Sequence, residues 1–236
     1  MASPERFSNL PDYAFPRLRR LLAGIEPGIK PGAEPVVLTI GEPRHGVPGW
    51  VPEVLAASAG ELAKYPPNEG TPELLAAISG WLGRRHGLDL GPDRITVVNG
   101  TREGLFNAAL TLCPETKAGA RPAILVPNPF YQVYAVAAAA VGAEAVFVNA
   151  SPATGALPDF AALPPAVLDR AAIAYLCSPA NPQGAIADEA YLERLVGLAE
   201  AHDFLIFADE CYPRSGATRP RPAPSRWPGG SGSATG

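Results

Sequence analysis

The sequence has 236 residues, of which 47% are hydrophobic and 18% are charged, and its formal net charge is −4. This composition is typical of a globular protein with a substantial core, and the charge gives no reason to expect a nucleic-acid or membrane partner. Three widely spaced cysteines (Cys113, Cys177 and Cys211) argue against a disulfide framework and favour a reducing, cytoplasmic location. We expect no signal peptide, no membrane span and no metal site, because no suitable apolar run or His/Cys cluster is present.

Prolines dominate the first 35 residues and break any long helix there. We expect an extended arm with a short helix around 15–23 and a short strand at 36–40. Helices are predicted at about 52–63 and from Pro72, where Thr71 is a good N-cap and Gly87 is the expected terminator.

A regular alternation begins near residue 95. Short apolar runs without polar alternation indicate strands that are covered on both faces, as in a parallel sheet. The runs are 95–98, 123–126, 145–148, 173–176 and 204–207. Predicted helices lie between them, at 102–112, 130–141 and 189–201, the last with Asp188 as N-cap. This order predicts a doubly wound α/β sheet.

Residues 213–236 do not continue the pattern. They contain four arginines, many Pro, Gly and Ser residues, and no Val, Leu, Ile, Met or Phe. Such a segment buries too little apolar surface to offset its ordering entropy, so we expect disorder. The alternative, a nucleic-acid tether, has only these arginines and one tryptophan to support it.

The first motif with chemical content is the run Asn99 to Gly104, between the predicted strand 95–98 and the next helix. Glycine permits a close turn, and the free N–H groups of a helix start attract phosphate. The alternative is an ordinary strand-to-helix turn, since neither a P-loop nor a complete GxGxxG motif is present.

Three further motifs follow later predicted strands. The run 127–131 carries an aromatic residue that suits either ring stacking or loop packing. The run 178–184 carries Asn181, and Asp209 and Tyr212 follow the predicted strand at 204–207. Ligands of open α/β folds gather at the carboxyl ends of the strands, so we expect these groups to converge. An aspartate there can hold a protonated ring nitrogen, and a tyrosine three residues later can reach the same ring's hydroxyl. A pyridoxal-phosphate enzyme requires this arrangement.

The ordered runs IGEPRH, KYPPNEGTPELLAAI, VVNGTREGLF, PNPFYQVY, CSPANPQGAI and ADECY carry a resemblance. Over about residues 8–212 the chain resembles the class I/II (fold type I) pyridoxal-phosphate aminotransferases. Within that group it is most similar to the succinyldiaminopimelate aminotransferases of bacterial lysine biosynthesis. The resemblance implies transfer of an amino group between an amino acid and a 2-oxo acid, with pyridoxal 5′-phosphate as cofactor, in a homodimer.

For the cofactor ring, the resemblance implies that Asp209 pairs with the pyridinium nitrogen. Tyr212 and Asn181 would bind the phenolic oxygen, and Tyr131 would stack on the ring. Asn181 is also expected to contact the substrate. The bonds Asn128–Pro129 and Asn181–Pro182 match positions that are often cis in the family.

For the phosphate, the resemblance implies contacts from Gly100, Thr101 and Arg102, mainly through backbone N–H groups. Gly41 would approach the substrate carboxylate. Tyr65 would reach the cofactor phosphate of the neighbouring subunit, which is the basis for expecting shared active sites.

The chain departs from the family pattern at the Schiff-base lysine, which is expected some tens of residues after the Asp209–Tyr212 element. Lys30, Lys64 and Lys117 are its only lysines, and all three precede that position. We therefore predict no catalytic residue in this chain. The carboxylate-binding arginine near the family's C-terminus has no counterpart either.

The implied fold is a fold-type-I large domain with a mainly parallel sheet, incomplete at its C-terminal side. The family's strand order is 3-2-4-5-6-7-1, and the runs 95–98 and 204–207 correspond to strands 1 and 5. Strands 6 and 7 and the C-terminal part of the small domain are missing. The expected domains are 1–50 (arm and part of the small domain), 51–212 (incomplete cofactor-binding domain) and 213–236 (tail).

The tail has the composition that GC-rich DNA encodes out of frame, so we hypothesise a frameshift or truncation after about Tyr212. The resulting chain is interpreted as a truncated aminotransferase. The alternative is an inactive remnant, at most a weak cofactor binder or subunit partner. Fold-type-I lyases and synthases share the same ring contacts, so reaction type depends on the family resemblance alone.

Overall fold

The computed structural model describes residues 4–8, 10, 13–26, 28–36, 41–42 and 45–212. The chain divides into two compact units: one comprises residues 12–71, and the other comprises residues 1–11 together with those from 72 onward. Most of the predicted strand at 36–40 and all of the tail from 213 lie outside the described residues.

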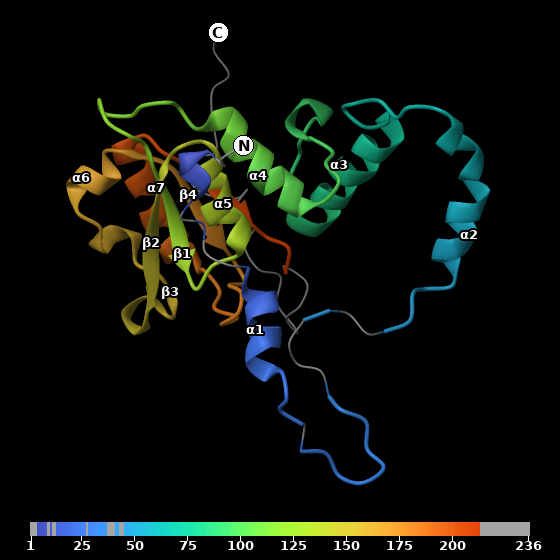
Figure 1. The fold of residues 1–236 in the computed structure, drawn as a ribbon. Coiled ribbons are helices and arrows are strands. Elements are labelled where there is room, and N and C mark those ends of the chain that lie inside the picture. The colour runs from blue at the N-terminus through green and yellow to red at the C-terminus, as the bar shows by residue number, and fades with distance from the viewer. Residues whose placement is uncertain are drawn as a thin grey trace. The chain divides into compact units, whose positions relative to one another are not determined.

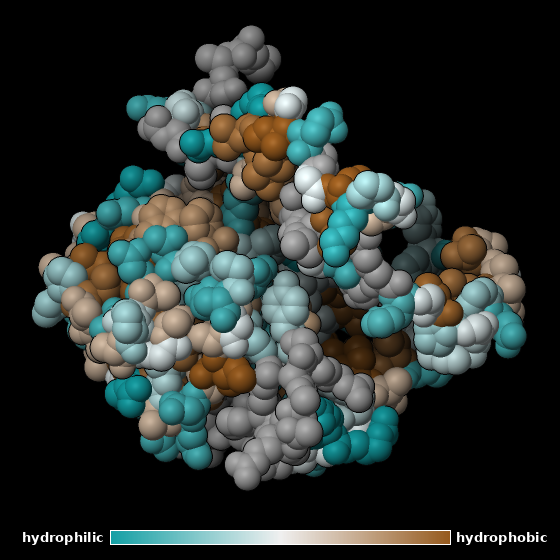
Figure 2. Space-filling model, turned by 90° about the horizontal axis from the view of Figure 1, so that it is seen from below, coloured by the Kyte–Doolittle hydropathy of each residue, from teal (hydrophilic) through white to brown (hydrophobic). Residues whose placement is uncertain are grey.

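The smaller unit contains helices α1 (Ala14–Leu22) and α2 (Trp50–Ala57) and the 3₁₀ helix η2 (Ala59–Ala63), which confirms helical structure in both predicted regions. None of the three contains a buried residue. Large apolar side chains are exposed, including Leu62, and Figure 2 shows apolar patches between hydrophilic residues on one face of the molecule. Helix α2, which the expected boundary at residue 51 assigns to the larger domain, belongs to the smaller unit.

The larger unit contains a five-stranded sheet in the order β3-β2-β1-β4-β5. Its strands are β1 (Ala123–Asn128), β2 (Glu144–Ser151), β3 (Leu157–Pro158), β4 (Ala171–Cys177) and β5 (Leu205–Asp209). All neighbouring pairs are parallel except β2 and β3. The order β2-β1-β4-β5 agrees with the expected 3-2-4-5, and the mainly parallel α/β fold is confirmed.

The helices of this unit are α3 (Pro72–His86), α4 (Thr101–Leu112), α5 (Gln132–Ala140), α6 (Pro165–Leu168) and α7 (Glu189–His202). The 3₁₀ helices are η1 (Glu5–Phe7), η3 (Pro92–Arg94), η4 (Pro152–Thr154) and η5 (Phe160–Ala162). None of the helices in the described ranges has both the length and the apolar character needed to cross a bilayer.

Two helix ends follow the sequence prediction. The Asp188 carboxylate accepts a 2.8 Å hydrogen bond from the backbone N–H of Tyr191, as an N-cap does. Helix α3 ends at His86, and the next residue, Gly87, has a φ of 66° that suits a glycine and donates its N–H to the carbonyl of Gly83 at 2.9 Å.

The core has two parts, one on each face of the sheet. Ile124 and Val126 of β1 pack with buried residues of α4 and α5, whereas Leu125 packs on the other face with Leu192 and Leu195 of α7. Successive strand residues point to opposite faces, so both faces need apolar side chains when both are covered (Figure 1). This explains why β4 is buried throughout and why its sequence shows no polar alternation.

The predicted strand at 95–98 is wrong. Ile95 has extended backbone angles (φ −123°, ψ 125°), but residues 95–98 pair with no strand of the part that the structure describes. An extended segment becomes part of a sheet only through hydrogen bonds to a neighbouring strand. The neighbours that the family order supplies are absent from the described sheet, and Val98 remains 41% exposed.

Candidate cofactor site

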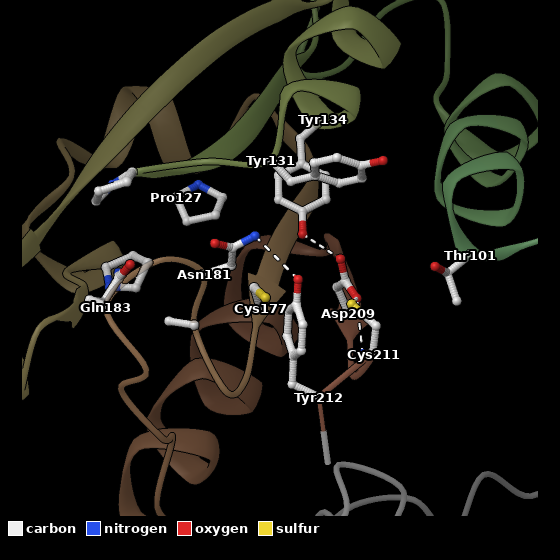
Figure 3. A pocket seen from close by; sticks show the side chains of 13 residues that line it. Thr101, Pro127, Tyr131, Tyr134, Cys177, Asn181, Gln183, Asp209, Cys211 and Tyr212 are labelled. Atoms are coloured by element: carbon white, nitrogen blue, oxygen red, sulfur yellow. Dashed lines mark hydrogen bonds between the residues drawn. The ribbon is translucent and has the colours of Figure 1, made fainter. Parts of the chain in front are cut away.

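A cavity of about 240 Å³ lies at the carboxyl ends of β1, β4 and β5 (Figure 3). Its walls come from the ends of these strands and from the starts of α4 and α5. The lining residues are Thr101, Pro127, Pro129, Tyr131, Tyr134, Pro158, Cys177, Ala180, Asn181, Gln183, Asp209, Cys211 and Tyr212. The convergence expected for the ends of parallel strands is therefore present.

Asp209, the last residue of β5, is the charged centre of this cavity and is only 5% exposed. Its Oδ2 accepts a 2.6 Å hydrogen bond from the hydroxyl of Tyr134. Its Oδ1 accepts hydrogen bonds from the backbone N–H and the thiol of Cys211, at 3.2 and 2.9 Å. Three donors on two oxygens fix the orientation of the carboxylate.

These donors keep their protons at neutral pH. Burial first, and then the negative charge of Asp209, raise the pKa of the Tyr134 hydroxyl far above its ordinary value. Burial and the hydrogen bond to Asp209 raise the pKa of the Cys211 thiol to about 12, and burial and Asp209 raise that of Cys177 to about 11. Both thiols are consequently poor nucleophiles, and Cys211 acts as a hydrogen-bond donor.

An aromatic wall faces Asp209. The rings of Tyr131 and Tyr134 meet edge to face at 5.8 Å, and Tyr134 stacks on Tyr175 at 4.4 Å. Arg102 donates from Nε to the hydroxyl of Tyr131 at 2.5 Å, with its guanidinium carbon 5.7 Å from the ring centroid. Contacts with Tyr134 and with Arg102 thus hold Tyr131 at the cavity.

Asn181 and Tyr212 lie on the opposite side of the cavity from α4 (Figure 3). The amide nitrogen of Asn181 donates to the hydroxyl of Tyr212 at 3.3 Å. The peptide bonds Asn128–Pro129 and Asn181–Pro182 are cis, which confirms that expectation, and Ser178–Pro179 is also cis.

The start of α4 has a conformation that only glycine adopts readily. Gly100 has φ 129° and ψ 156°, and no side chain caps the first amides of the helix. The Glu103 carboxylate turns back to accept a 2.7 Å hydrogen bond from the N–H of Asn99. Uncapped amides at a helix start, as at Gly100, attract anions in general.

The structure brings together most of the predicted site residues. Five of them line the cavity, namely Thr101, Tyr131, Asn181, Asp209 and Tyr212. Gly100 and Arg102 adjoin it through α4. Gly41 and Tyr65 belong to the smaller unit, where the side chain of Tyr65 is fully exposed, and their roles stay predictions.

Lys117 lies near the amino-terminal end of β5, whereas the cavity lies at the carboxyl end of this strand. Its Nζ donates to the carbonyl of His202 at 3.0 Å and to that of Asp203, just before β5 begins. Asp209 ends the same strand, so the length of β5 separates Lys117 from the cavity. Lys30 and Lys64 belong to the smaller unit.

Sequence reasoning did not name the other eight lining residues as site residues, and these include Tyr134, Cys177, Gln183 and Cys211. Tyr134 was detectable, because it lies three residues after Tyr131 on a predicted helix and hence near it. Cys211 lies between two predicted site residues, but the sequence does not indicate that its thiol donates a hydrogen bond to Asp209. Within the described ranges, no three His, Cys, Asp or Glu side chains form a group that suits a metal ion.

Comparison with known proteins gives a consistent result. The family model for class I and II aminotransferases matches residues 33–227. An LL-diaminopimelate aminotransferase of Moorella thermoacetica is 32% identical over 215 residues, which are 90% of this chain and 53% of that protein. A second, from Dehalococcoides mccartyi, matches at the same identity and coverage. The chain thus spans about half the length of the curated relatives it matches.

Solved structures agree. An aminotransferase of Neisseria meningitidis has a TM-score of 0.80 and 37% identity, covering 89% of this chain and 52% of that one. The aminotransferase AspB of Helicobacter pylori has a TM-score of 0.78 and 30% identity, covering 95% of this chain and 55% of that one. The chain therefore belongs to the class I and II aminotransferases, a family whose cofactor is pyridoxal 5′-phosphate.

Proposed function

We propose that this chain binds pyridoxal 5′-phosphate at Asp209 and forms the cofactor-binding part of an aminotransferase that moves an amino group between an amino acid and a 2-oxo acid. One observation carries the proposal: in a chain of this family, a buried aspartate is fixed by three donors in a cavity with an aromatic wall. The chain spans only about half the length of its relatives, so the complete aminotransferase activity is itself proposed here.

The residues present fit the cofactor. An oriented carboxylate at Asp209 suits a protonated ring nitrogen, and the face of Tyr131 suits stacking. Asn181 and Tyr212 offer polar groups for the ring oxygen. When bound, the cofactor withdraws electrons from the reacting carbon of the substrate.

The phosphate would lie at the start of α4, where Gly100, Thr101 and Arg102 supply backbone N–H groups. Gly41 would approach the substrate carboxylate, as Asn181 would. Tyr65 would reach the phosphate bound by a second copy, so the working protein would be a homodimer.

For the substrate, we propose an amino acid of the diaminopimelate type. The relatives named LL-diaminopimelate aminotransferase support this class, and the sequence motifs resemble those of enzymes for the succinylated form. The two forms differ at the far end, where one carries a free ammonium group and the other a neutral amide with an added carboxylate. Competition between the two compounds for the cofactor-loaded chain distinguishes them.

Titration of the full chain with pyridoxal 5′-phosphate tests the proposal, with the cofactor's absorbance as readout. We expect saturable binding that Asp209→Asn weakens by about tenfold or more, since a charged hydrogen bond is lost. Asp89→Asn, at an exposed position outside the cavity lining, should not change the affinity. Equal affinities for both variants would contradict the assignment.

A second candidate is a chain that binds the cofactor without catalysing transfer. The position of Lys117 at the amino edge of the sheet favours it. Borohydride reduction of the loaded chain, followed by intact mass measurement, separates the two. A cofactor-sized mass increase on a lysine supports a complete site, whereas saturable binding without labelling supports the second candidate.

A further inference from the structure

Gln183 and Thr101 lie on opposite sides of the cofactor cavity, with Asn181 and Tyr212 between them (Figure 3). The proposed cofactor contacts extend from Thr101 to Asn181 and Tyr212, so they leave the side at Gln183 to another part of the bound molecules. Asn181, two positions before Gln183, is itself expected to contact the substrate. Gln183 is thus placed to contact the substrate beyond Asn181.

The two ends of the Gln183 amide have different surroundings. Its Nε2 donates to the carbonyl of Ala156 at 3.3 Å. A carbonyl accepts hydrogen bonds and cannot donate them, so the group beside Ala156 must be the NH₂ of the amide. The other end is then the carbonyl oxygen, Oε1, which is buried and has no hydrogen-bond partner among the described residues.

This oxygen is the only buried side-chain nitrogen or oxygen without a partner in the part of the chain that the structure describes. Buried polar atoms of native proteins nearly always have a partner, so the exception requires an explanation. The contact from Nε2 to Ala156 is longer than the about 2.9–3.0 Å of a typical N–H···O bond, so the amide is only weakly held in its present orientation. A ligand with an N–H group on this side of the cavity supplies the donor that Oε1 lacks.

The charge of the cavity wall favours the same kind of ligand. Asp209 is the one charged residue among the described residues that line the cavity. A carboxylate placed beside Gln183 would meet no cation of this wall, and Nε2 already donates to Ala156. An ammonium group or an amide N–H at the same place meets an acceptor.

We propose that Gln183 determines substrate specificity by accepting, through Oε1, a hydrogen bond from an N–H group at the far end of the substrate side chain. The site then prefers amino acids with a terminal nitrogen to those that end in a methyl group or a carboxylate. This inference rests on the proposed function, because it places a substrate beside the cofactor-binding residues.

The test measures amino-acid binding to the full ¹⁵N-labelled chain by NMR titration. L-Lysine, L-norleucine and L-2-aminoadipate are the probes, because their side chains have similar lengths and end in an ammonium, a methyl group and a carboxylate. Pyridoxine 5′-phosphate fills the cofactor site, since it has no aldehyde that could react with an amine. We expect lysine to bind about tenfold more tightly than norleucine, to shift the side-chain NH₂ signal of Gln183, and to bind more tightly than 2-aminoadipate.

Two variants of Gln183 separate hydrogen bonding from packing. Gln183→Leu keeps the approximate size of the side chain and should abolish the preference for lysine over norleucine. Gln183→Glu keeps an acceptor and should retain that preference. Gln132→Leu, at the other glutamine of the chain and outside the cavity lining, should bind the three probes as wild type does. Thermal unfolding of each variant confirms that it is folded.

The titrations are repeated without the cofactor analogue, so a chain that does not bind the analogue counts against the proposed function and leaves this test intact. Equal affinities of the wild type for lysine and norleucine would overturn the inference, because Oε1 would then take its donor from water. A lysine preference that persists in Gln183→Leu would also overturn it. An equal loss of all three probes in that variant would assign Gln183 a structural role instead.

Discussion

The hydroxyl of Tyr134 donates a 2.6 Å hydrogen bond to the buried carboxylate of Asp209, and this bond joins helix α5 to the end of β5. The two residues are 75 positions apart in the chain. Tyr134 also stacks on Tyr175 of β4, so its hydroxyl is held in place by packing as well as by the bond. The orientation of Asp209 therefore depends on a residue outside its own loop.

Tyr134→Phe should destabilise the protein by about 1–3 kcal/mol, because it leaves a buried charged acceptor with one donor fewer. Urea unfolding measures this change. Tyr191→Phe is the matched control, since its buried hydroxyl donates at 2.8 Å to the neutral carbonyl of Pro158. We expect a smaller loss there, about 0.5–1.5 kcal/mol. Equal losses would show that the charge of Asp209 does not strengthen the bond.

Stability should also depend on the protonation of Glu210. Its folded-state pKa is raised from 4.5 to about 7, so the folded chain binds more protons than the unfolded chain between these values. The free energy of unfolding should then fall as pH rises from about 4.5 to about 7, and level off above.

Glu210→Gln should remove this contribution and raise stability at about pH 8 relative to wild type. The measurement is the urea midpoint at about pH 5 and about pH 8. Glu193→Gln, at an exposed position of α7, should leave the pH dependence unchanged. If Glu210→Gln also leaves it unchanged, burial does not control this carboxyl group.

The sheet was largely predictable from the sequence, because a strand covered on both faces leaves a continuous apolar run. Ile173 and Leu176 of β4 face different parts of the core, and both had to be apolar. The same reasoning failed at 95–98, since composition records a segment's β-propensity but not whether a neighbouring strand is present. The two-residue strand β3 is too short for any periodic signal.

For the site, the sequence was informative about residues at strand ends and uninformative about their partners. Asp209 and Asn181 follow apolar runs and were found. The donors to Asp209 were not, because a contact between α5 and β5 depends on how the helix packs across the sheet. Tertiary packing brings Tyr134 to this carboxylate from 75 positions away, whereas Cys211 reaches it through a local turn that its residue type does not signal.

The backbone at Gly100 provides a third prediction. Its φ of 129° is unfavourable for a side chain, so Gly100→Ala should cost about 1–3 kcal/mol although no atom lies within 4 Å of the added Cβ. Gly197→Ala, in α7 and equally free of contacts, should instead stabilise by about 0.5–1 kcal/mol. Thermal unfolding compares them, and similar effects in both variants would contradict a conformational requirement at Gly100.

The last prediction concerns Tyr131, whose ring and hydroxyl have separable roles. If the ring stacks on the bound cofactor, Tyr131→Ala should weaken pyridoxal phosphate binding by about three- to tenfold, as expected for loss of about 0.5–1.5 kcal/mol of stacking. Tyr131→Phe keeps the ring but loses the hydrogen bond from Arg102 and should bind nearly as wild type. Equilibrium titration measures both affinities. A phenylalanine variant as weak as the alanine variant would assign the role to the Arg102 contact instead of the ring.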